Sequence, residues 1–253
     1  MELSNILETE KIFIENTEFN IEKKQYETLK EILKETGTKI EDVKYYSSPL
    51  NNEKYFSIAL EKGNITSLQI KNYKLKNVSE KIGHLKKLYY LDLCSNDISD
   101  LPKNIEELVE LKYLFLSNNK ISVLGESITG LAKLEELYLL NNNIQKLPES
   151  INYLFKLKVL VLEKNNLQTL PESIGNLKEL QILHLNNNNI SKLPKEFENL
   201  SALKILYLNK NPIKILPKNI ENIKSLRIIF LNIDQTISIP KKSQKFRMVY
   251  LNN

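Results

Sequence analysis

The sequence of 253 residues is poor in the residue types on which most enzyme and metal sites depend. Cys94 is its single cysteine, so the chain can form no internal disulfide and no cysteine-based zinc site. Its two histidines lie far apart, which argues against a histidine metal site or a Ser-His-Asp set. None of its six glycines belongs to a phosphate-binding loop. We therefore expect no catalytic residues, no metal and no cofactor, and we expect that the chain is not an enzyme.

Long apolar runs are also absent. No segment approaches the roughly 18 apolar residues of a membrane span, and the first residues, MELSNILETEK, lack the apolar stretch of a signal peptide. With 42% hydrophobic and 26% charged residues, the composition is that of a soluble globular protein. These features predict a cytoplasmic protein without a membrane span. A secreted or surface location would require that a signal has been removed.

Arginine is scarce, because only Arg227 and Arg247 accompany the lysines among the 36 basic residues. The guanidinium forks that suit base and phosphate recognition are therefore nearly missing, and we expect no nucleic-acid partner. The net charge is +5, yet residues 203–253 carry 10 basic against 2 acidic residues. This basic end could bind nucleic acid or an anionic surface through Lys241, Lys242, Lys245 and Arg247. A solvated cap is the favoured interpretation.

One pattern returns every 23 residues, most cleanly in LEELYLLNNNIQKLPESINYLFK at residues 134–156. Six consecutive copies begin at residues 88, 111, 134, 157, 180 and 203, and weaker copies begin at Ile65 and Leu226. In each copy LxxLxL has the alternation of a strand, and LPxxIxxL has the spacing of a short helical turn. Neither element is stable alone, so stacked copies are expected to share a continuous core. For the copy at 134 the predicted core residues are Leu134, Leu137, Leu139, Ile144, Leu147, Ile151 and Leu154.

The pattern LxxLxLxxNxIxxLPxxIxxL resembles the leucine-rich repeat family, in the 23-residue form common in bacterial and intracellular repeat proteins. The resemblance covers residues 65 to about 248. It implies an α/β fold: a curved, right-handed solenoid with short parallel strands on its concave face and short helical or 3-10 turns on its convex face.

Asparagine occupies position nine of every regular repeat. These residues are Asn96, Asn119, Asn142, Asn165, Asn188 and Asn211. The resemblance implies a structural ladder in which their amides pair with buried backbone groups of adjacent turns. In the run of four asparagines at 186–189, Asn188 is then the rung, and Asn189 is expected in a turn with unusual backbone angles. Asn186 and Asn187 are expected on the concave rim, where they could meet a ligand.

Residues 1–64 have no repeat and are predicted to form a small N-terminal α/β cap. Asn20 can cap a helix from Ile21 to about Thr36, which Gly37 would end, with Tyr26, Leu29, Ile32 and Leu33 on one face. The runs KIFIEN and DVKYY could be strands. A turn at Lys62, Gly63 and Asn64 predicts a hairpin into the first repeat. The alternative is a loosely ordered leader followed by that hairpin.

The two ends of the repeat array look like caps. Repeats occupy residues 65–248, and the first and last put Tyr73 and Asp234 where the ladder asparagine belongs. Such degenerate repeats shield the exposed ends of a solenoid core. The tail of residues 249–253 follows, and a final strand is expected within Phe246 to Leu251.

Positions three and five of the repeats point to solvent, yet aromatic and branched apolar residues dominate them. The predicted partner-binding residues on the concave face are Tyr90, Tyr113, Phe115, Glu136, Tyr138, Val161, Ile182, His184, Ile205, Tyr207 and Phe230. An exposed apolar band bordered by charges has the composition of a protein interface. Alternatively, these residues are present only because they suit strands.

These features predict a noncatalytic protein-interaction module, expected to be a monomer, that binds a protein or peptide partner on its concave sheet. The alternative is the recognition part of a bacterial effector or an enzyme-associated protein, whose catalytic domain is absent from this chain.

Overall fold

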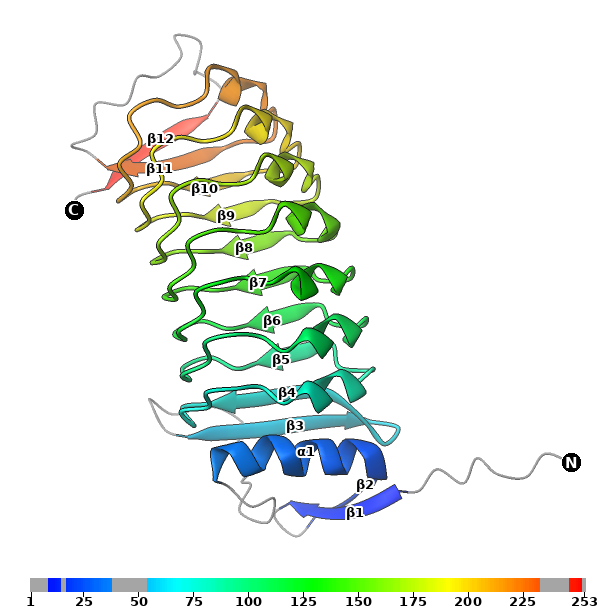
Figure 1. The fold of residues 1–253 in the computed structure, drawn as a ribbon. Coiled ribbons are helices and arrows are strands. Elements are labelled where there is room, and N and C mark those ends of the chain that lie inside the picture. Colours follow the sequence, from blue (N-terminus) through cyan, green and yellow to red (C-terminus); the bar gives the residue numbers. More distant parts are fainter. Residues whose placement is uncertain (1–8, 15–16, 38–53, 233–245, 252–253) are drawn as a thin grey trace, which may run out of the picture.

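The computed structural model describes residues 9–14, 17–37, 54–232 and 246–251. The repeats stack into an elongated, curved array, with the strands on one face and short 3-10 helices on the other (Figure 1). A ten-stranded sheet runs through the whole array in the order β12-β11-β10-β9-β8-β7-β6-β5-β4-β3. The expected leucine-rich-repeat solenoid is confirmed.

Each repeat contributes one short strand at its LxxLxL segment, and neighbouring strands are parallel and in register. The repeat strands are β4 (Asn64–Lys71), β5 (Tyr90–Asp92), β6 (Tyr113–Phe115), β7 (Glu136–Tyr138), β8 (Val159–Val161), β9 (Ile182–His184), β10 (Ile205–Tyr207) and β11 (Ile228–Asn232). Residues at the same repeat position face one another across the sheet. The 23-residue period therefore aligns equivalent residues in columns across the sheet.

The LPxxIxxL segments form 3-10 helices. In the described ranges these are η2 (Glu80–His84), η3 (Lys103–Glu107), η4 (Glu126–Gly130), η5 (Glu149–Tyr153), η6 (Glu172–Asn176), η7 (Lys195–Asn199) and η8 (Lys218–Asn222). A proline precedes five of them, as Pro148 does, where its fixed φ near −65° suits the entry and no amide hydrogen is needed. Its carbonyl accepts the first bond of the turn, from Ile151 N at 3.1 Å.

The core lies between the sheet and the 3-10 helices. The seven core residues predicted for the repeat at 134 are all buried, and none exceeds 7% exposure. Burial of each such side chain stabilises the fold by roughly 1.5–3 kcal/mol relative to exposure. Because the same positions are buried in successive repeats, the core is continuous along the array.

The six ladder asparagines are buried and bond in the same way. Asn142 Nδ2 donates to Leu116 O at 3.0 Å in the preceding repeat and to Leu139 O at 3.2 Å in its own. Its Oδ1 accepts from Ile121 N at 3.0 Å. The equivalent bonds occur at the other five positions. Each amide thus pairs backbone groups that the turn would otherwise bury without partners.

The turn after each strand places position eight in the left-handed region, with φ between 54° and 61° in seven repeats. In the asparagine run this residue is Asn187, with φ 57°, so the expectation that Asn189 takes the unusual angles is wrong. The chain reverses before the rung rather than after it. Asn186 is also buried, at 7% exposure, which leaves little of it to meet a ligand on the concave rim.

The N-terminal segment forms a hairpin and a helix. Strands β1 (Thr9–Ile14) and β2 (Thr17–Glu22) pair antiparallel, and α1 (Lys23–Thr36) follows directly. Asn20 lies within β2 opposite Lys11, so it is not the helix cap; Glu22 stands there and makes no side-chain capping bond. Residues 17–22 extend the strand instead of starting the helix, because TEFNIE alternates polar and apolar residues as a strand does. The DVKYY segment lies outside the described residues.

The helix packs on the first repeats with Leu29, Ile32 and Leu33 buried, and Gly37 ends it in the left-handed conformation at φ 68°. Gln25, 3% exposed, ties it to the array: its Oε1 accepts from Ile65 N at 2.7 Å and its Nε2 donates to Asn64 Oδ1 at 3.0 Å.

The two ends of the sheet differ. Antiparallel β3 (Tyr55–Glu61) joins β4 through the expected turn at Lys62 and Gly63. At the other end β12 (Arg247–Leu251) lies parallel to β11, within the range expected for a final strand. Asp234, Lys241, Lys242 and Lys245 lie outside the described residues.

Candidate protein-binding face

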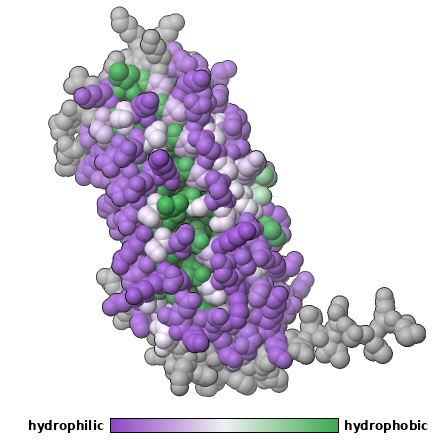
Figure 2. All heavy atoms as spheres, in the orientation of Figure 1, coloured by the Kyte–Doolittle hydropathy of each residue, from purple (hydrophilic) through white to green (hydrophobic). Residues whose placement is uncertain are grey.

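Positions three and five of the repeats form two columns on the concave face. The in-register pairs place Tyr113 beside Glu136, and Phe115 beside Tyr138. Most column members are only half-buried, so they line the surface rather than the core. Val161 is an exception at 8% exposure. Figure 2 shows the result as a band of apolar residues that runs over the strands between hydrophilic borders.

The aromatic members of the columns gather into two groups. In the first, Phe115 lies 4.7 Å from Tyr138 and 5.1 Å from Tyr90 between ring centroids, with Tyr113 beside them. In the second, His184, Tyr207 and Phe230 form a stack.

The stack has centroid spacings of 4.0 and 4.3 Å and rings tilted by 15° and 2°. The valines of β8 separate the two groups. Among the predicted site residues, Ile182 and Ile205 lie beside the stack in the position-three column. The structure therefore divides the predicted site into an N-terminal and a C-terminal aromatic half.

Acidic groups of the N-terminal half already have partners. Asp92 is 2% exposed and forms an ion pair with Lys71 at 2.6 Å. Glu136 accepts from the Tyr138 hydroxyl at 2.9 Å. Burial, followed by the nearby carboxylates, raises the pKa of Tyr90 and of Tyr138 to about 12. Both phenols are consequently neutral at physiological pH.

Position two forms a charged rim where the chain enters the strands. Glu135 is shared by Lys158 at 2.7 Å and Lys112 at 3.5 Å. Its pKa is lowered, mainly by the hydrogen bond from Lys158. Farther along, Lys204 Nζ donates to the neutral Gln181 Oε1 at 2.7 Å. The rim therefore changes from internally paired to cationic along the array.

Neither Cys94 nor His184 has the surroundings of a reactive group. Burial, with Asp92 beside it, raises the pKa of the Cys94 thiol to about 12, which keeps it protonated. Burial also lowers the pKa of His184, so the ring is neutral near pH 7 and packs as an aromatic residue. Within the described ranges, no group of three His, Cys, Asp or Glu residues could hold a metal.

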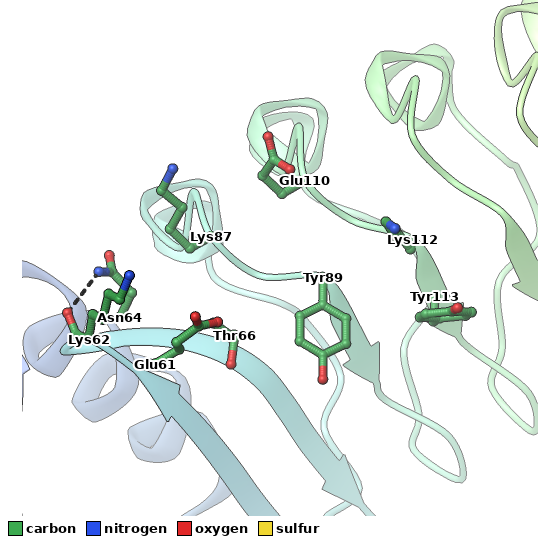
Figure 3. A pocket seen from close by; sticks show the side chains of 9 residues that line it. All are labelled: Glu61, Lys62, Asn64, Thr66, Lys87, Tyr89, Glu110, Lys112 and Tyr113. Atoms are coloured by element: carbon green, nitrogen blue, oxygen red, sulfur yellow. Dashed lines mark hydrogen bonds between the residues drawn. The ribbon is translucent and has the colours of Figure 1, made fainter.

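One feature was missed from the sequence. A hollow of about 700 Å³ lies beside the starts of β4 to β6 (Figure 3). The side chains that line it are Glu61, Lys62, Asn64, Thr66, Lys87, Tyr89, Glu110, Lys112 and Tyr113. Tyr89 is 43% exposed there. Tyr89 occupies position two of its repeat, where the other repeats have charged or polar residues. This difference is the sequence feature that indicates a specialised rim.

The comparisons with known proteins agree with this architecture. The sequence matches the family described as leucine-rich repeat region over residues 149–245, and the leucine rich repeat family over 63–121 and 86–144. None of the curated proteins compared with the chain matches it.

Three solved structures illustrate the likeness. An LRR protein of Leptospira interrogans is 31% identical with TM-score 0.65, covering 73% of this chain and 54% of its own. PEPR1, in a structure with AtPEP1, is 29% identical with TM-score 0.69, covering 89% and 34%. Internalin C2 of Listeria monocytogenes is 25% identical with TM-score 0.63, covering 74% and 81%. This chain thus spans only about half of the Leptospira protein.

The chain belongs to the leucine-rich repeat proteins, whose repeats generally serve as protein-interaction modules. No helix in the described ranges is long and apolar enough to cross a membrane.

Proposed function

We propose that the chain is a noncatalytic protein-interaction module that holds a polypeptide partner on its concave sheet. The observation that carries this proposal is the alignment of half-buried aromatic and branched residues in two columns over β5–β11. The eight repeat strands β4–β11, at about 4.8 Å spacing, extend roughly 35 Å, enough for an ordinary interface. Aromatic residues are also enriched among those that dominate binding energy. PEPR1, a related repeat protein, was solved together with AtPEP1, and this supports a role in partner binding for the present chain.

The test is affinity capture of partners from the source cell, followed by mass spectrometry. A variant with Phe115, Tyr138 and Tyr207 changed to Ala should lose the captured polypeptide while its circular dichroism stays that of a folded repeat protein. The matched control changes Val123, Tyr153 and Phe155 to Ala, since these are 64%, 60% and 51% exposed and lie off the two columns. Capture that survives in the folded concave variant would place the binding surface elsewhere.

A second candidate is the recognition part of an effector or enzyme-associated protein. It is supported by the matches to longer chains, of which this one covers 54% and 34%. The concave sheet would then select the target for a catalytic domain. A reading frame in the source genome that joins these repeats to such a domain would favour this candidate, and a frame that holds the repeats alone would remove it.

A further inference from the structure

The concave surface of β9–β12 differs in charge from the rest of the sheet. All acidic residues between Leu180 and Asn232 lie on the convex side: Glu196 and Glu198 in η7, and Glu221 in η8. The strands of this half therefore present no carboxylate. In the N-terminal half, by contrast, Asp92, Glu135 and Glu136 all lie on the sheet or its entry rim.

Three cations lie near the aromatic stack in this half, two of them on the entry side of the strands and one on β12. Lys204 and Arg227 occupy position two of two successive repeats. Arg247, on β12, pairs with Ile228 of the position-three column. All three residues are exposed. Lys204 bonds to a neutral amide, and no carboxylate of the described ranges forms an ion pair with any of the three. Among the described residues, their charge is therefore unbalanced on this face.

An apolar pad lies next to these cations. It consists of the His184–Tyr207–Phe230 stack and the adjoining column of Ile182, Ile205 and Ile228. The pad and the cations together have the chemistry that complements a segment carrying apolar residues and carboxylates. We propose that β9–β12 bind an acidic polypeptide segment, whose apolar side chains lie on the pad and whose Asp and Glu residues reach Lys204, Arg227 and Arg247.

Nucleic acid is the other polyanion that these cations could attract, but the pad suits it poorly. Bases bind by stacking on open aromatic faces. Here the three rings cover one another at 4.0 and 4.3 Å, and the remaining column is isoleucine, which offers no ring. The arrangement therefore favours a polypeptide. This inference rests on the proposed function and specifies the chemistry of the partner.

The experiment selects ligands from a random twelve-residue peptide library displayed on phage, with the full chain as bait. Selected peptides should be rich in Asp and Glu among apolar residues. Synthetic copies should lose about tenfold or more in affinity for Lys204→Glu/Arg227→Glu, because two exposed ion pairs become repulsive. They should also bind more weakly as salt rises. The control Lys192→Glu/Lys214→Glu makes the same change in net charge at exposed sites off the concave columns and should stay within about twofold.

Each contrary outcome has a distinct meaning. Selected peptides that are neutral or basic, or an equal loss in both charge variants, would overturn the acidic partner while leaving concave binding intact. Tighter binding of a single-stranded oligonucleotide than of the peptides would also overturn it. Selected peptides that bind the folded Phe115/Tyr138/Tyr207→Ala variant unchanged would instead contradict the proposed function itself.

Discussion

At the scale of single residues, the repeat assigns different tasks to chemically identical side chains. Asn141, Asn142 and Asn143 are consecutive, yet only Asn142 is buried. Asn141 adopts a left-handed backbone at φ 55°, which asparagine tolerates better than most residues. Asn143 is exposed, and it is its backbone amide that bonds to Ile121 O. Position in the repeat, rather than residue type, therefore decides the role.

Replacement of Asn142 by Ala should destabilise the fold by about 1–3 kcal/mol or more. The buried Ile121 amide would lose its partner, and the Leu116 carbonyl would keep only its bond from Asn119. Replacement of Asn143 by Ala is the matched control and should change stability by no more than about 0.5 kcal/mol, as is usual for surface sites. Chemical denaturation of both variants measures the difference. Equal effects would mean that the amide bonds contribute nothing beyond the bulk of the side chain.

At the scale of elements, the entry to each 3-10 helix has a fixed backbone that proline fits. Gly125 stands where five other repeats have proline, and its φ of −66° and ψ of 162° match those of Pro148 at −66° and 149°. The five prolines have no amide hydrogen, so the fold needs none at this position. The fold therefore does not require the conformational freedom of glycine at position 125.

Replacement of Gly125 by Pro should raise the free energy of unfolding by about 0.4–1 kcal/mol, since it restricts the unfolded chain. Gly175→Ala should have the opposite effect. An added Cβ there would lie 2.1 Å from the Glu196 carbonyl oxygen, so η6 and η7 must separate. Such overpacking costs about 1–3 kcal/mol. Thermal unfolding of the two variants tests the pair, and a stabilising Gly175→Ala would contradict the close approach.

How far the sequence predicts these elements follows from how periodic they are. The strands, the 3-10 turns and the core recur in phase, so one repeat predicts the next. The predicted helix start at Asn20 is wrong, although asparagine is a good capping residue. Asn20 instead pairs with Lys11 in a hairpin, and this pairing depends on tertiary contacts that local sequence does not show.

The concave columns follow from the period, but the division of the site does not. Stacking of His184 on Tyr207 depends on side-chain rotamers, which spacing does not determine. The hollow beside Tyr89 likewise arises from the junction of the hairpin with the first repeats, a contact without any repeat to predict it.

At the scale of the whole molecule, each repeat packs mainly against its two neighbours. The contacts between 3-10 helices and between strands join consecutive elements. Stability is then close to a sum of repeat and interface contributions, as in other solenoids. The ends are closed by α1 and the β3–β4 hairpin on one side and by β12 on the other.

Deletion of residues 134–156 should therefore leave a folded protein. It joins Lys133 to Leu157, so every strand, ladder asparagine and 3-10 helix stays in phase, and the array loses one repeat. The variant should be less stable but cooperative, with circular dichroism of the parent type. Deletion of 134–145 alone breaks the phase and should yield an unfolded or aggregated chain. Folding of both deletions to the same extent would refute the nearest-neighbour description.

The constant 23-residue period of the array also has a genetic consequence. Because each repeat occupies the same whole number of codons, unequal exchange between two copies in the gene keeps the reading frame. Such an event adds or removes one strand, one rung and one pair of surface residues at once. The concave face can therefore change in length, and the two aromatic halves can change their separation, while every repeat keeps the same core packing.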